Sequence, residues 1–185
     1  MKLTRYLQSA WLTVAIAGMA LGCQAESDST TVDTSSSLEE SDVIVRSPDA
    51  MPDFSLPDLD GNDIRLSDHA DKVVLVNFWA TTCPPCLREM PDFVEIQNEY
   101  GSDMFTIIGI SLDLGGEDRV SRFVDDYQLN FPIVMGNQDV VIDYGNIRGI
   151  PTTFILNKDH ELVAKRVGMV TKQMITPIID SLVRL

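Results

Sequence analysis

Cysteine, histidine and basic residues are scarce in this sequence of 185 residues. Three cysteines are too few for a small disulfide-stapled protein. Two histidines leave few ligands for a structural zinc site, which needs four. Lysine and arginine number 14 against 28 acidic residues, so the net charge is −14, and a basic nucleic-acid-binding face is not expected. Hydrophobic residues make up 44% and charged residues 23%, which is typical of a globular domain and not of a disordered chain, collagen or coiled coil.

The N-terminus is typical of an export signal. Lys2 and Arg5 precede the uncharged stretch 6–25, which is mostly apolar in its middle, as in a secretory signal peptide. The stretch includes the letters ALGC, with Cys23 last, and these resemble the bacterial lipobox, in which the cysteine is lipidated and becomes the new N-terminus. The lipobox usually has Leu three places before the cysteine, where this chain has Ala. We therefore expect residues 1–22 to be a signal peptide and Cys23 to be the lipid attachment site.

Two alternatives remain for this segment. An uncleaved transmembrane anchor is one, since about 18 apolar residues can span a bilayer, although Gln8, Ser9 and Thr13 weaken it. A cleaved soluble protein with an unmodified Cys23 is the other. All three forms place the rest of the chain outside the cytoplasm, in the cell envelope. Cleavage would leave 12 basic against 28 acidic residues and a net charge of −16.

Residues 23–47 are expected to form a tether. Serine, threonine and acidic residues dominate them, and aromatic residues are absent. Such a composition cannot bury enough apolar surface to offset the entropy of ordering the chain. We expect this segment to hold a single domain, residues 48–185, away from the membrane.

The domain itself alternates predicted strands and helices. A strand pair over 54–66 surrounds an Asp-Gly-Asn turn, and 72–79 is a continuous apolar run typical of a buried central strand. Pro91 is expected to bend the first helix. Further predicted strands are 104–112, 131–135, 152–156 and 162–167; the predicted helices are 84–100, 117–127, 140–144 and one that begins after Thr171 or Thr176. This order predicts an α/β fold with a partly parallel sheet.

The chemistry is expected at Cys83-Pro-Pro-Cys86, where a buried strand meets a helix. Unpaired N–H groups and the helix dipole favour negative charge at that end, so Cys83 is expected to form the thiolate that attacks disulfides. Cys86 lies one turn further and can resolve a mixed disulfide. Half of a zinc site and a purely structural disulfide are the alternatives. Zinc lacks ligands here, and a stabilising disulfide usually closes a longer loop.

Two segments carry a resemblance to a known family. Residues 77–91, NFWATTCPPCLREMP, resemble the active-site segment of the TlpA/ResA branch of the thioredoxin-like superfamily, which is related to the AhpC/TSA proteins. Residues 150–156, IPTTFIL, resemble its cis-proline strand, and Ile150-Pro151 is a candidate cis peptide. The resemblance implies a thioredoxin-like fold with an N-terminal β-hairpin and a helix–strand insertion before the cis-proline strand.

The same resemblance assigns roles to residues. Cys83 would be the exposed nucleophile and Cys86 the resolving thiol. Pro151, with Ile150 and Thr82 beside the pair, would dock an extended substrate. Glu89 matches the buried acid of the ResA-like members; a buried carboxyl has a raised pKa and can exchange protons with a thiol. A solvent-exposed helix glutamate is the alternative.

The chain departs from the family at two positions. Thr82 stands where the family usually has Trp, which removes an aromatic shield and adds a hydroxyl group near the sulfur. Asn77 stands where thioredoxins proper carry a buried Asp, which favours Glu89 as the proton carrier.

The family resemblance also implies a function. Its members are extracytoplasmic, membrane-tethered thiol-disulfide oxidoreductases, often reductants, for example in cytochrome c maturation. The expected partners are protein thiol or disulfide substrates and an upstream electron donor, with the membrane reached through an N-terminal lipid or anchor. We expect a monomer without metal or other cofactor and without a nucleic-acid partner.

Two competing functions use related scaffolds. A peroxiredoxin-like thiol peroxidase carries a threonine three residues before its reactive cysteine and a proline earlier, but this chain has Ala80 and Val76 there. A copper-binding assembly chaperone has three residues between its cysteines and a partnering histidine, but only two residues separate Cys83 from Cys86. Both patterns therefore fail at the residues that define them.

Overall fold

A computed structural model describes residues 49–184, apart from the side chain of Ser102. The expected signal peptide, the lipid site at Cys23 and the tether 23–47 lie outside the described residues and stay predictions. Within the described part, no helix is long and apolar enough to cross a bilayer.

A five-stranded mixed sheet forms the centre, in the order β5-β4-β3-β6-β7. β3, β4 and β5 are parallel, whereas β6 and β7 are antiparallel to their neighbours. Every residue of β3 and β4 is buried, as their continuous apolar runs predict. The strands are β3 (Val73–Trp79), β4 (Phe105–Ser111), β5 (Ile133–Met135), β6 (Thr152–Leu156) and β7 (Leu162–Val167).

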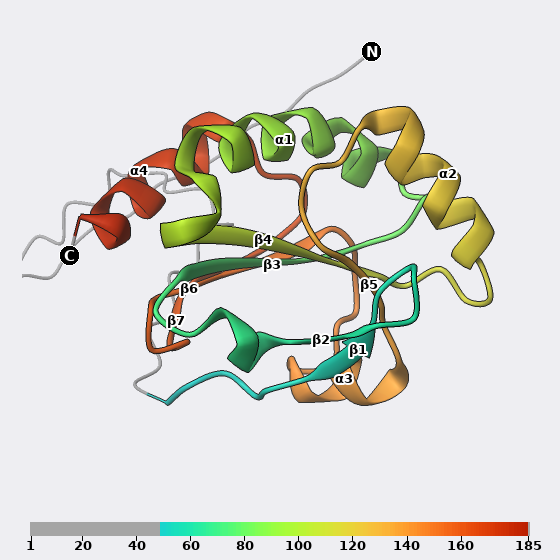
Figure 1. Cartoon of the computed structure of the whole chain (residues 1–185), viewed down its shortest axis with the longest axis horizontal. Helices are drawn as coiled ribbons and strands as arrows, with labels where there is room; N and C mark the ends of the chain where they lie inside the picture. Colours follow the sequence, from blue (N-terminus) through green and yellow to red (C-terminus); the bar gives the residue numbers. More distant parts are fainter. Residues whose placement is uncertain (1–48, 185) are drawn as a thin grey trace, which may run out of the picture. The chain divides into compact units, whose positions relative to one another are not determined.

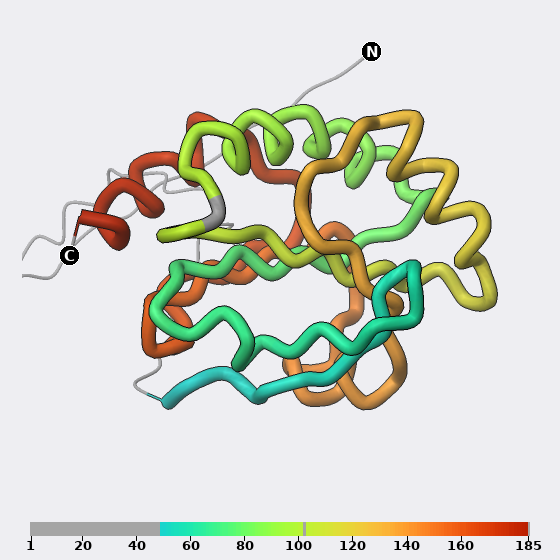
Figure 2. Tube along the Cα trace, viewed as in Figure 1, coloured from blue at the N-terminus to red at the C-terminus, as the bar shows by residue number. Residues whose placement is uncertain are grey.

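Helices and a hairpin cover the two faces of this sheet. Figure 1 shows α1 (Pro84–Met104), α2 (Glu117–Tyr127) and α4 (Lys172–Val183) on one side of it. The other side carries α3 (Gln138–Asp143) and the hairpin of β1 (Ser55–Pro57) and β2 (Asp63–Arg65), followed by the 3₁₀ helix η1 (Leu66–His69). The trace in Figure 2 runs from the hairpin through η1 into β3. This arrangement confirms the thioredoxin-like fold with its N-terminal hairpin and its inserted helix and strand.

Alternation along β3 divides the core into two layers. Val73, Leu75 and Trp79 pack toward the side of α1 and α4, with both active-site cysteines. Val74, Val76 and Phe78 pack toward the hairpin and α3. Successive side chains of a strand point to opposite faces, so Asn77 points into the same layer as Leu75 and Trp79.

The first and last helices refine the predicted boundaries. Within α1 the backbone leaves helical angles at Gly101, where φ is 67°, and not at Pro91. Glycine adopts such a positive φ without a steric penalty, so the break falls near the end of α1 and not at the proline. Of the two predicted starts for α4, Thr171 is correct and Thr176 is wrong, and Pro177 lies inside the helix.

Candidate functional site

Cys83 and Cys86 lie where β3 ends and α1 begins. Cys83 is the N-cap of α1, and its sulfur accepts a hydrogen bond from the backbone N–H of Cys86 at 3.3 Å. Pro84 occupies the first helical position, where a missing N–H costs little. The two cysteines form a disulfide with an S–S distance of 2.07 Å. Both cysteines are buried in the disulfide form, so Cys83 is not the exposed residue that the resemblance implies. At 7% exposed against 0% for Cys86, Cys83 is still the more accessible of the two.

The cis-proline segment lies beside the end of β3. The Ile150–Pro151 peptide is cis, which confirms the expected geometry. The antiparallel register pairs Phe78 with Thr152. Ile150 and Pro151 directly precede Thr152, so they lie opposite the residues that follow Phe78 and lead to Cys83. Ile150 is half-buried and packs against the apolar layer that contains both cysteines. The N–H of Gly168 donates to the carbonyl of Pro151 at 2.7 Å and links the end of β7 to this segment.

Thr82, the third expected docking residue, is exposed. Its position directly before Cys83 places it at the surface around the pair.

Glu89 is buried, with 1% of its surface exposed, so the alternative of a solvent-exposed helix glutamate is wrong. Its Oε1 accepts from Nδ2 of Asn77 at 2.8 Å, and its Oε2 accepts from the N–H of Val170 at 3.1 Å. Asn77 also donates to Oγ1 of Thr153, its cross-strand neighbour, at 3.1 Å. Burial raises the pKa of Glu89 to about 7, and the nearby charge of Asp92 adds to the rise, whereas the hydrogen bonds from Val170 and Asn77 oppose it.

A pKa near 7 makes Glu89 suitable for moving protons at neutral pH. The group is i+3 from Cys86 on α1, and residues at that spacing are neighbours on one helix face. A carboxyl group that is half-ionised near neutral pH can both accept and return a proton. The described site therefore combines a disulfide-bonded cysteine pair with a buried carboxyl group whose pKa lies near 7.

We expect Glu89→Gln to change how stability depends on pH. The folded pKa lies above the ordinary value of 4.5, so the folded state holds the proton more tightly between pH 4.5 and about 7. Wild-type stability therefore falls as pH rises through that window and levels off above it. Gln resembles the protonated acid at every pH. The free energy of unfolding of the wild type, relative to the variant, is expected to fall by about 3 kcal/mol across the window. Urea unfolding at pH 4.5, 6 and 8 measures this; equal pH dependence in both proteins would contradict it.

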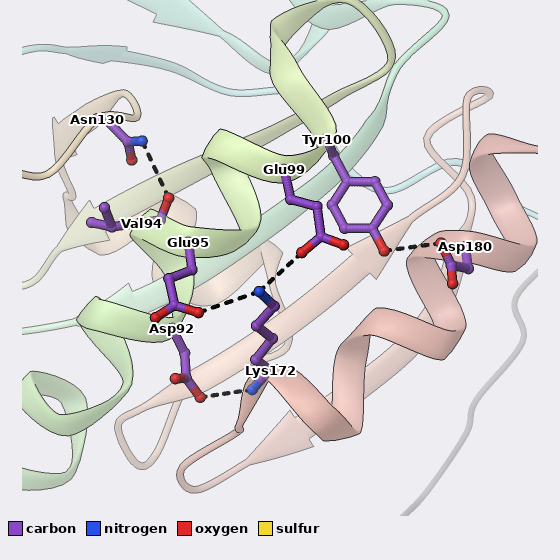
Figure 3. A network of polar contacts seen from close by, with 8 residues as sticks. All are labelled: Asp92, Val94, Glu95, Glu99, Tyr100, Asn130, Lys172 and Asp180. Atoms are coloured by element: carbon purple, nitrogen blue, oxygen red, sulfur yellow. Dashed lines mark hydrogen bonds and ion pairs between the residues drawn. The ribbon is translucent and has the colours of Figure 1, made fainter.

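Polar contacts between α1 and α4 hold the segment that carries Val170. Asp92 accepts from the N–H of Lys172, at the start of α4, at 2.7 Å. The ammonium group of Lys172 lies between two glutamates of α1, at 3.2 Å from Glu95 and 2.9 Å from Glu99. Figure 3 shows these contacts, with Tyr100 donating to Asp180 further along the helices. The backbone N–H of Val170, which donates to Glu89, is thus held in place by the contacts of Lys172 with Asp92, Glu95 and Glu99.

Asp113 is a site residue that the sequence analysis missed. It lies just after β4, and its buried carboxylate accepts from the N–H and the hydroxyl group of Thr81, at 2.8 and 2.6 Å. The signal was present in the parallel pairing of the two apolar strands. Residues that follow the carboxyl ends of adjacent parallel strands lie at one edge of the sheet. The contribution of Val170, in contrast, is a backbone N–H that any residue type could supply.

Among residues 49–184, no three histidine, cysteine or acidic side chains are grouped so that they could hold a metal ion.

The fold and the cysteine pair together define a thioredoxin-like protein of the thiol-disulfide oxidoreductase class. Residues 48–165 match the family model described as "AhpC/TSA family". The chain belongs to this family.

Characterised relatives carry matching names. The chain is 39% identical over 137 residues to thiol-disulfide oxidoreductase ResA of Halalkalibacterium halodurans, covering 74% of this chain and 77% of that protein. It is 37% identical over 131 residues to the thioredoxin-like protein YneN of Bacillus subtilis, covering 70% of this chain and 76% of that protein. The family and these relatives identify the protein as a thiol-disulfide oxidoreductase.

Solved structures agree with this assignment. A secreted thiol-disulfide isomerase from Corynebacterium glutamicum superposes with a TM-score of 0.73 at 27% identity, covering 82% of this chain and 96% of that one. StoA from Bacillus subtilis superposes with a TM-score of 0.59 at 26% identity, covering 70% and 98%.

Proposed function

We propose that the protein reduces disulfides of client proteins outside the cytoplasm, with Cys83 as the attacking thiol and Cys86 as the resolving thiol. The observation that carries this proposal is the placement of the pair. Cys83 caps α1 and is the more accessible of the two, whereas Cys86 is buried one turn further. The backbone N–H of Cys86 donates to the Cys83 sulfur and stabilises negative charge on it.

The reaction balances without a cofactor. The Cys83 thiolate attacks a client disulfide, a bond forms between Cys83 and one client sulfur, and the other client sulfur leaves as a thiolate. Cys86 then gives its proton to Glu89 and attacks the Cys83 sulfur. The bond from Cys83 to the client breaks, and the second client thiolate takes a proton. The client gains two electrons, and the pair ends as the Cys83–Cys86 disulfide.

Pro151, Ile150 and Thr82 are proposed to dock the client. The exposure of Thr82 and the partial exposure of Ile150 support this, because Thr82 directly precedes Cys83 and Ile150 packs against the apolar layer that contains both cysteines. An extended client segment would lie along residues 150–151 with its cysteine at Cys83.

The reducing direction is proposed from the resemblance of residues 77–91 to the TlpA/ResA branch, whose members often act as reductants. A client with two cysteines in a haem-attachment motif, as in cytochrome c maturation, fits that direction.

The reduced protein is mixed with a peptide in which the Cys-X-X-Cys-His motif is oxidised, and peptide thiols are counted. We expect stoichiometric reduction of the peptide. Recovery of the peptide disulfide, with the protein still reduced, would contradict the reducing direction.

Hydrogen peroxide separates this function from a peroxidase. A thiol-disulfide oxidoreductase reacts slowly with peroxide, whereas a peroxidase turns over rapidly through a sulfenic acid at its reactive cysteine. We expect no rapid turnover. Fast peroxide consumption with a sulfenic acid at Cys83 would favour the peroxidase instead.

The cell envelope is the proposed location, with residues 1–22 removed, Cys23 lipidated and the monomeric domain 48–185 held by the tether. The export-type N-terminus supports this, as does the structural neighbour from Corynebacterium glutamicum, which is described as secreted. We expect Cys23→Ser to move the protein from the membrane to the soluble fraction of a bacterial host. Unchanged membrane association in that variant would favour an uncleaved anchor.

A further inference from the structure

The segments that follow β3 and β4 leave the sheet side by side. The parallel register pairs Trp79, the last residue of β3, with Ser111, the last residue of β4. The N–H of Leu112 donates to the carbonyl of Trp79 at 2.8 Å and continues the pairing beyond both strands. Thr81 and Asp113 lie two residues further along each chain, so they occupy corresponding positions at this edge of the sheet.

Asp113 is a buried carboxylate with donors on several sides. Its Oδ2 accepts from the N–H of Thr81 at 2.8 Å and from the hydroxyl group of Ser111 at 3.0 Å, and its Oδ1 accepts from the hydroxyl group of Thr81 at 2.6 Å. Nε of Arg119, on α2, lies 3.5 Å from Oδ1. A buried carboxylate is stable only when such donors replace its water. Two of these donors belong to one residue, Thr81, so the carboxylate fixes both the backbone and the side chain there.

Thr81 lies on the short connection that delivers Cys83 to the start of α1. The N–H of Cys83 donates to the carbonyl of Ala80 at 3.1 Å, which makes this connection a tight turn. The turn orients Cys83 so that its sulfur receives the N–H of Cys86. Thr81 precedes Cys83 by two residues, so a shift of the backbone at Thr81 also moves the Cys83 sulfur.

We propose that Asp113 is a positioning residue for Cys83: it holds the turn 80–82 so that the Cys83 sulfur stays over the N-terminus of α1. This inference rests on the proposed role of Cys83 as the attacking thiol. Arg119 of α2 lies beside the same carboxylate and contributes to its charge balance.

The test uses the reduced full chain and two substitutions at one position. Asp113→Ala removes every acceptor. Asp113→Asn keeps an oxygen for the N–H of Thr81 and offers an N–H to its hydroxyl oxygen, so it restores the turn without the charge. Asp118→Ala, on the exposed surface of α2, is the matched control. The rate of alkylation by iodoacetamide is followed from pH 5 to 10, with the modified cysteine identified by mass spectrometry.

We expect Asp113→Ala to slow alkylation of Cys83 at pH 7 about tenfold and to move the midpoint of its pH dependence up by about one unit, because the thiolate loses the N–H and dipole of the helix. The alkylation rate of Asp113→Asn should stay within about threefold of the wild-type rate, since one neutral hydrogen bond is worth little. The control Asp118→Ala should react at the wild-type rate. An unchanged rate and midpoint in folded Asp113→Ala would overturn the inference.

A second variant covers the case in which Asp113→Ala does not fold. Thr81→Val removes only the hydroxyl donor and keeps the backbone bond. It should slow alkylation about threefold, as expected for one lost hydrogen bond, and move the midpoint in the same direction. Wild-type behaviour of Thr81→Val would count against Asp113 as a positioning residue. Alkylation of Cys86 in place of Cys83 in the wild type would instead overturn the proposed function, so the two failures are distinguishable.

Discussion

Cys83→Ser is expected to abolish disulfide reduction, whereas Cys86→Ser is expected to arrest the reaction halfway. A serine hydroxyl is not ionised near neutral pH and cannot attack a disulfide, so the first step is lost. In Cys86→Ser the first step remains, but nothing attacks the Cys83 sulfur from inside the fold. The client should therefore stay bound to Cys83.

The measurement is a single turnover of an oxidised client peptide by the pre-reduced protein, with no other reductant present, followed by non-reducing electrophoresis. Cys86→Ser should accumulate a covalent adduct that dithiothreitol releases, with mass spectrometry locating the bond at Cys83. Cys23→Ser is the control, because the third cysteine has no part in the proposed exchange and its loss should leave turnover unchanged. Equal turnover in all three variants and the wild type would exclude the pair as the reacting centre.

Glu89→Gln should have the second-largest effect, and one that depends on pH. The resolving step needs Cys86 to lose its proton inside a dry core, and the Glu89 carboxylate is the buried base on that face of α1. Its pKa of about 7 predicts that resolution accelerates as pH rises through neutrality. Gln cannot accept the proton. At pH 7 we expect resolution to slow about 100-fold, the lower range for loss of a general base, and the inflection near pH 7 to disappear.

Stopped-flow decay of the mixed disulfide between pH 5 and 9 measures this step. Glu95→Gln is the matched control. Glu95 is an exposed glutamate on the same helix, and its carboxylate pairs with Lys172. The difference between Glu89→Gln and the wild type should shrink at high pH, where the thiol ionises without help. A variant that keeps the neutral inflection would show that another group carries the proton.

Local patterns predicted the scaffold well, because the strongest signals were long and regular. The apolar run ending in Trp79 could only be a buried strand, and the proline after Cys83 suits the first turn of a helix. The predicted helix 84–100 stops directly before Gly101, whose positive φ interrupts α1. Boundaries near helix ends depend on such single residues.

The cysteines, Pro151 and Glu89 could be singled out from the sequence because each belongs to a short motif. Asp113 was not, because its role depends on which residues the register of β3 and β4 brings together. The environment of Glu89 was only partly predictable. Its burial was expected from the resemblance to the ResA-like members, with an exposed glutamate as the alternative. The donor from Val170 depends on where the chain passes after β7. Contacts of this kind arise from the tertiary structure and leave no local pattern.

The most direct test of the central claim is the reduction equilibrium of the Cys83–Cys86 pair in the full chain. The protein is equilibrated against glutathione or dithiothreitol buffers, and the free thiols at these two positions are counted. We expect a single two-electron transition with a reduction potential of about −270 mV, the value of the reductant thioredoxin. A potential near about −120 mV would make the protein an oxidant and contradict the proposed direction. A pair that never cycles would contradict the central claim itself and leave the disulfide as a structural bridge.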